Sequence, residues 1–178
     1  MMLDISVSYN RYKFLGHEFL TWLWFLMETA PEQLVNQNEE PVLLGLGSRI
    51  VLENSRGEAI ETITIKGGES ELAEGRLAVQ RGAVVTEMNV NLDYNGMVWM
   101  FDIKGESLDV SGLKLPESDG SDGSDKQEVE AAVLDRIDLY ETVVAFVQHT
   151  YTRFIKNRIS TEWQNTTVPR MKQWITSS

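Results

Sequence analysis

The sequence predicts an α+β fold: an antiparallel sheet with a hairpin over residues 84–104, an apolar N-terminal helix, and a long C-terminal helix packed on the sheet. Three patterns lead to this fold class. They are a dense apolar run near the N-terminus, strict alternation of apolar and polar residues in the middle of the chain, and apolar residues at spacings of three and four near its end. A chain of 178 residues suits one domain with one core.

The apolar run predicts a helix from about Leu15 to Thr29. Three of its few polar side chains, His17, Thr21 and Glu28, fall near one face at spacings of four and seven. The rest of the helix surface is apolar and must be covered, so this helix is expected inside a core or at a subunit interface. The interface candidates are its aromatic residues Phe19, Trp22, Trp24 and Phe25.

The next segment predicts two adjacent strands and a short helix. Residues 49–53 and Ala59–Lys66 have the composition of strands, with a turn at 54–57 between them. A helix then runs from about Glu71 to Arg81, with acidic residues in its first turn and Gly82 just past its end.

Alternation in the middle of the chain predicts a β-hairpin. Apolar and polar residues alternate through Met88–Tyr94 and again through Met97–Ile103, and Asn95-Gly96 between them is typical of a tight turn. One side of the hairpin should face the core and the other largely face water. A short extended piece from Ser107 to Leu115 follows.

The last third of the chain predicts a flexible acidic loop at 117–126 and then one long amphipathic helix from about Gln127 to Arg158. Together these segments define a single α+β domain over residues 1–160. Residues 161–178 form a basic, aromatic C-terminal tail with a short helix that starts at Pro169 and runs through Trp174.

Composition narrows the function classes. The chain has no cysteine, which excludes disulfides and thiolate chemistry, and we expect a cytoplasmic protein. Its net charge of −11 argues against a surface that binds nucleic acid all round. The N-terminal apolar run is shorter than the roughly 20 residues that cross a bilayer, so no membrane association is expected.

No set of catalytic residues is apparent. The two histidines, His17 and His149, have no second ligand at helical spacing, and Gly45-Leu46-Gly47-Ser48-Arg49 lacks the pattern of a nucleophile motif. The acidic loop matches a calcium loop poorly, because Ser124 stands where the sharp turn needs glycine. We therefore predict that the protein is not an enzyme and has no metal or cofactor.

The end of the chain is basic and aromatic, and it leaves two interpretations open. Arg153, Lys156 and Arg158 could track a phosphate backbone, with aromatic side chains stacking on bases. Alternatively, this basic segment pairs with the acidic stretch 117–141 of its own chain or of a partner chain. The net charge favours the second interpretation.

The stretches 71–74 and 81–85, then 88–92, the aromatic hairpin arm and 108–115, resemble the C-terminal half of the RdgC family of recombination-associated proteins. The resemblance covers roughly residues 15–155. It implies a non-enzymatic, DNA-binding homodimer, with Lys66, Arg76 and Arg81 at the positions of phosphate contacts.

Two functions follow as alternatives. The first is a non-catalytic RdgC-like module that binds DNA independently of sequence, in recombination or in the nucleoid. The second is an acidic module for protein–protein interaction or oligomerisation, which recognises a basic protein partner and does not bind DNA. In both cases we expect a homo-oligomer that associates through the aromatic N-terminal helix or the long C-terminal helix.

Overall fold

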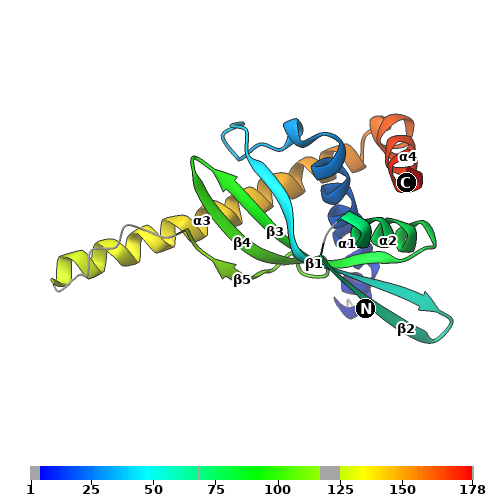
Figure 1. Ribbon diagram of the computed structural model, residues 1–178, viewed down its shortest axis with the longest axis horizontal. Coiled ribbons are helices and arrows are strands. Elements are labelled where there is room, and N and C mark those ends of the chain that lie inside the picture. The colour runs from blue at the N-terminus through cyan, green and yellow to red at the C-terminus, as the bar shows by residue number, and fades with distance from the viewer. Residues whose placement is uncertain (1–4, 68, 117–124, 178) are drawn as a thin grey trace.

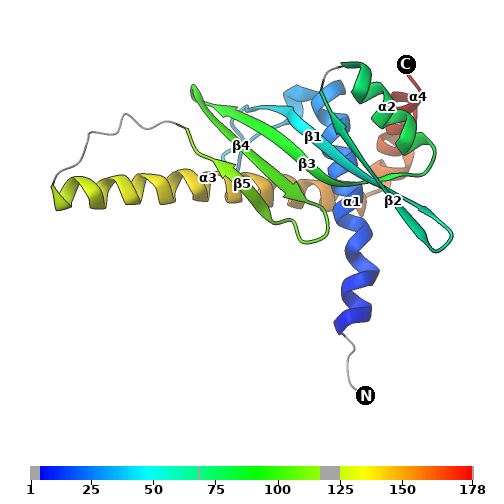
Figure 2. The ribbon, with the colours of Figure 1, turned by 60° about the horizontal axis from the view of Figure 1, so that its bottom comes forward.

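The computed structural model describes residues 5–67, 69–116 and 125–177, and it has the predicted α+β architecture (Figure 1). Five antiparallel strands form one sheet in the order β2-β1-β3-β4-β5. Their bounds are β1 Leu43–Arg56, β2 Ala59–Lys66, β3 Val84–Tyr94, β4 Met97–Lys104 and β5 Val110–Lys114. Helices cover one face of this sheet, and the core lies between them and the strands (Figures 1 and 2).

Helix α1, Ile5–Thr29, begins ten residues before the predicted start. Residues 5–15 contain neither proline nor glycine, so nothing in this stretch ends a helix. The short 3-10 turn η1, Pro31–Gln33, follows it. From Phe19 to Leu26 the helix is almost wholly buried, with Thr21 the one half-buried residue. The core alternative for this segment is therefore correct.

Two glycines bring α1 against the end of β4. A Cβ atom on Gly16 would lie 1.6 Å from the carbonyl oxygen of Gly105, far inside van der Waals contact. The backbones of the helix and of the β4–β5 connection therefore touch directly. This contact fixes where α1 crosses the sheet.

The predicted hairpin is confirmed. Tyr94 pairs with Met97 and Leu92 with Trp99, across a turn in which Asn95 and Gly96 both have positive φ. The buried side chains of the two strands come from alternate positions: Met88, Val90, Leu92, Trp99, Phe101 and Ile103. Polar residues between them lie on the face of the sheet that the described helices leave open.

Strand β1 is longer than predicted, because it already starts at Leu43. Its pairing with β3 shifts between Leu46 and Ile50, which makes a β-bulge in this part of the strand. Within this bulge the Ser48 amide donates a 2.9 Å hydrogen bond to the Asn89 side-chain oxygen. The bulge therefore satisfies its extra backbone donor with a side chain of the neighbouring strand.

The remaining elements are α2 (Glu69–Gln80), α3 (Lys126–Arg158), a π-helical turn at Trp163–Thr167 and α4 (Val168–Thr176). Helix α4 packs on α1 and α2, and its Trp174 is buried, so the predicted basic tail is built into the core. Most of the predicted acidic loop, residues 117–124, lies outside the described residues.

Candidate interaction surface

The first half of α3 projects from the body of the molecule. In both views the helix continues well beyond the sheet, with its N-terminal end pointing away (Figures 1 and 2). The last firm contact with the sheet is a 3.0 Å hydrogen bond from the Trp99 indole to the Leu139 carbonyl. Among the described residues of α3, buried side chains occur only from Val143 onward. We call residues 126–141 the arm and residues 142–158 the packed half.

Apolar side chains on the arm are exposed. They retain 48–65% of their accessible surface, and they are Val129, Val133, Leu134, Ile137 and Tyr140. Spacings of four, four and three along Val129, Val133, Ile137 and Tyr140 place these four on one side of the helix. A stripe of this kind on a projecting helix is typical of a surface that another molecule covers.

The stripe continues into a groove on the same helix. Val144, Val147 and Tyr151 extend the spacing of the arm, and Leu108 and Val110 from the β4–β5 connection and β5 form the opposite wall. This α3–β5 groove has a volume of about 580 Å³ and begins at Tyr140, so the stripe and the groove meet without a break. One face of α3 therefore carries an apolar ridge at one end and, at the other, a groove lined by both apolar and polar side chains, Asp109 among them.

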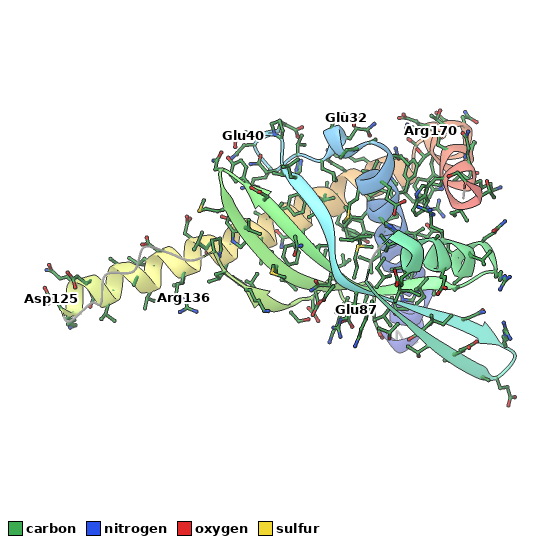
Figure 3. All side chains as sticks on the ribbon, viewed as in Figure 1. Glu32, Glu40, Glu87, Asp125, Arg136 and Arg170 are labelled. Carbon is green, nitrogen blue, oxygen red and sulfur yellow. The ribbon has the colours of Figure 1, made fainter. Side chains whose placement is uncertain are left out.

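Charge divides along the same helix. The arm has five acidic and two basic side chains, whereas the packed half has three basic side chains and no acidic one. Figure 3 shows Asp125 at the tip of the arm, Arg136 along it, and Arg170 of α4 at the opposite end of the molecule. Along α3 the charge of the helix itself therefore changes from acidic on the arm to basic on the packed half.

The structure places the six candidate phosphate contacts in two groups. Lys66 ends β2 and Arg76 and Arg81 belong to α2 or its end, whereas the others lie in the last two turns of α3: Arg153, Lys156 and Arg158. Several are engaged within the chain. Arg76 forms a 2.6 Å ion pair with Glu28, Arg158 forms one of 2.7 Å with Glu18, and Arg153 donates to the Gln33 carbonyl. Lys66, Arg81 and Lys156 are exposed.

The four aromatic interface candidates face inward. Phe19, Trp22, Trp24 and Phe25 are 0–5% exposed. Their neighbours belong to the same chain: the Phe19 ring lies 5.6 Å from that of Phe154, and the Trp24 ring lies 5.1 Å from that of Trp174. In this fold these four aromatic side chains leave almost no surface for a second molecule, whereas the first half of α3 is accessible.

Glu28 joins three helices at the end of this aromatic core. Its carboxylate accepts hydrogen bonds of 2.7 Å from the indoles of Trp24 and Trp174, in addition to the Arg76 ion pair. The side chains of Glu28 and Arg76 retain 22% and 21% of their surface. The arrangement pairs the indole donors, which would be costly to bury without an acceptor. Both Glu28 and Arg76 therefore have structural roles in this fold.

A second apolar cavity, of about 360 Å³, lies between α1, α4 and the α2–β3 connection. Val79, Val168, Met171 and Ile175 line it, and His17, Glu18 and Lys172 stand among its walls. Unlike the α3–β5 groove, it does not continue the exposed stripe of the arm.

In the part of the chain that the structure describes, no three His, Asp or Glu side chains are grouped to hold a metal ion, and no helix is long and apolar enough to cross a membrane. No protein-family model, no curated protein and no solved structure matches the chain. The resemblance to RdgC therefore stays a prediction.

Proposed function

We propose that this chain is a non-catalytic protein-interaction module whose recognition element is the arm of α3. The observation behind this proposal is the apolar stripe of the arm, with Val133 51% and Ile137 48% exposed, whereas the apolar face of the packed half contributes to the core. Burying such side chains is favourable by about 25 cal/mol for each Å² removed from water, so a partner that covers the stripe gains binding energy directly.

The charges beside the stripe indicate what kind of partner fits. Acidic residues outnumber basic ones on the arm by five to two, and the whole chain carries −11. Charged rims of interfaces steer association and reject partners of like charge. A surface with apolar side chains at its centre and basic residues at its rim would complement the arm.

A crosslinking experiment in the cell tests this proposal. A photoreactive amino acid replaces Val133 on the arm, which is 51% exposed, or, as a control that is at least as accessible, Ile60 on β2, which is 68% exposed. We expect protein adducts from position 133 and few or none from position 60. Equal yields at both positions, or adducts that nuclease removes, would contradict a protein-binding role of the arm.

DNA binding by an RdgC-like module is the second candidate, and the observation that favours it is the grouping of cations near the C-terminus. After residue 141 the sequence has five Lys or Arg residues against one Glu. Phosphate contacts by these side chains would release counterions, so affinity for DNA would fall steeply as salt is raised.

A titration of duplex DNA over a salt series separates the two candidates. Lys156→Glu combined with Lys66→Glu and Arg81→Glu is the informative variant, because these three side chains are exposed and represent both groups of cations. Arg76 is left intact, because its loss would leave Glu28 without its ion pair. Our proposal predicts no salt-sensitive binding. Tight binding at low salt that the triple variant weakens would favour the DNA-binding module.

A further inference from the structure

The acidic and basic parts of α3 cannot meet within one molecule. Glu130 and Arg153 are 23 residues apart in one continuous helix, which at 1.5 Å per residue separates them by about 35 Å. A helix cannot fold back on itself. An attraction between the arm and the basic packed half therefore has to act between two molecules.

The apolar stripe of one molecule can likewise pack in the groove of another. Each molecule has both features on one face of α3, with the exposed stripe centred near Ile137 and the groove near Val147. A two-fold axis that passes close to residue 142 would place the stripe of each copy in the groove of the other. A contact of this kind is closed, because both copies use the same surface and no unpaired surface remains to recruit a third.

We propose that the arm docks in the α3–β5 groove of a second copy of this chain, with the two α3 helices antiparallel. This inference rests on the proposed function of the arm and names its partner. The arm, with its excess of acidic residues, then lies beside the packed half of the other copy, whose own Lys and Arg residues are Arg153, Lys156 and Arg158, while the groove wall contributes one carboxylate, Asp109. A parallel pair would instead bring two acidic arms together and be opposed by their repulsion.

Apolar spacing selects the register of the pair. From residue 133 to residue 151 the stripe follows steps of four and three, the pattern by which paired helices interdigitate. In the favoured register the facing residues of the two copies are Val133 and Tyr151, Ile137 and Val147, and Tyr140 and Val144. A shift by one heptad would set Glu130 against Val147 and place a charge in the groove. In the favoured register Glu130 lies past the groove, about one turn from Arg158 of the second copy.

The oligomeric state tests the inference with a matched pair of variants. Ile137→Asp should weaken association about 100-fold, because a two-fold contact loses each side chain twice. Ile60→Asp makes the same substitution at an exposed isoleucine of β2 and should leave association unchanged. Association should also weaken as salt is raised, since it brings unlike charges together. Sedimentation over a concentration series measures all three. A wild-type protein that stays monomeric throughout, or equal loss in both variants, overturns the inference.

Engineered thiols test the orientation, because the natural chain has no cysteine. Val133→Cys mixed with Tyr151→Cys should give a disulfide-linked dimer, because both positions keep accessible surface and face each other in the favoured register. Neither variant should crosslink by itself. In the antiparallel pair two copies of position 133 lie about 27 Å apart along the axis, beyond the roughly 7 Å between Cα atoms that a disulfide spans. Crosslinking of Val133→Cys alone would show a parallel pair and overturn the proposal.

The crosslinking experiment at position 133 separates this inference from the proposed function. Adducts with twice the mass of the chain support both. Adducts with a different protein, together with a wild-type chain that sediments as a monomer, leave the interaction role of the arm intact and overturn the second copy as its partner. Absence of any protein adduct contradicts both.

Discussion

The arm and the packed half of α3 belong to one helix and share one apolar spacing, but only the packed half finds its partner within the chain. Val143 in the packed half is fully buried, whereas Val133 in the arm is 51% exposed. The packed half lies against the sheet and α1, where Phe154 meets the rings of Phe19 and Trp22. Amphipathicity thus shows that a helix face needs covering, but it does not show which molecule covers it.

The largest loss of stability is expected when α1, on which the packed half lies, is moved away from the sheet. In Gly16→Ala the new methyl group would overlap the Gly105 carbonyl, and we expect a loss of about 3 kcal/mol or more in the free energy of unfolding. Gly45→Ala is the control, since a Cβ at Gly45 has no atom within 4 Å. Urea unfolding measures both. A Gly16→Ala variant as stable as Gly45→Ala would show that α1 is not seated on this contact.

The same substitution at one valine in each half of α3 compares how much each half contributes to stability. Val143→Ala removes two methyl groups from the core and should cost about 2 kcal/mol, whereas Val133→Ala in the monomer should cost less than about 0.5 kcal/mol. Thermal unfolding of dilute protein, where association is minimal, gives both values. An equal cost for the two valines would mean that the chain itself covers the arm.

The smallest expected effect concerns the hydrogen bond between Tyr94 and Glu40, which lies outside both halves of α3. Hydrogen bonds from Tyr94 and Asn36 hold the pKa of the Glu40 carboxyl below its ordinary value, and the hydrogen bond to Glu40 raises the pKa of Tyr94. Because the pKa of Glu40 is lower in the folded state, its contribution to stability is present above the ordinary carboxyl pKa. That contribution is lost as the pH falls through the lower, folded-state value.

Nuclear magnetic resonance can follow this carboxyl group directly. Tyr94→Phe removes the main hydrogen bond, so the pKa of Glu40 should rise toward its ordinary value. Tyr140→Phe on the arm should leave it unchanged. If Tyr94→Phe has no effect on the titration of Glu40, the hydrogen bond does not persist in solution.

Much of this fold was predictable from local patterns. The Met88–Ile103 hairpin followed from alternation and an Asn-Gly turn, and both are local signals. The starts of α1 and β1 were predicted too late, because the dense apolar run and the β-branched residues mark only the buried parts of these elements. Burial depends on contacts between distant segments, and single-residue patterns do not report those contacts.

The accessible surface was harder to predict than the fold. Phe19 and its neighbours looked equally suited to a core and to an interface, and only the positions of α3 and α4 show that this chain covers them. The exposure of the arm could, however, have been predicted by comparing the length of the helix with that of a strand. A helix of 33 residues is about 50 Å long, whereas the eight residues of β4 span about 26 Å, so α3 extends past β4, the strand whose Trp99 is hydrogen-bonded to it.

Strand β2 ends the sheet, and along its outer side the backbone amides and carbonyls have no neighbour among the strands that the structure describes. Isoleucine and threonine dominate its sequence, and Glu61 is the sole charged residue between Ala59 and Ile65. An open edge of this composition could pair with the same edge of an identical copy. Like charges at Glu61 oppose that edge-to-edge stacking, so this carboxylate acts against strand addition between copies.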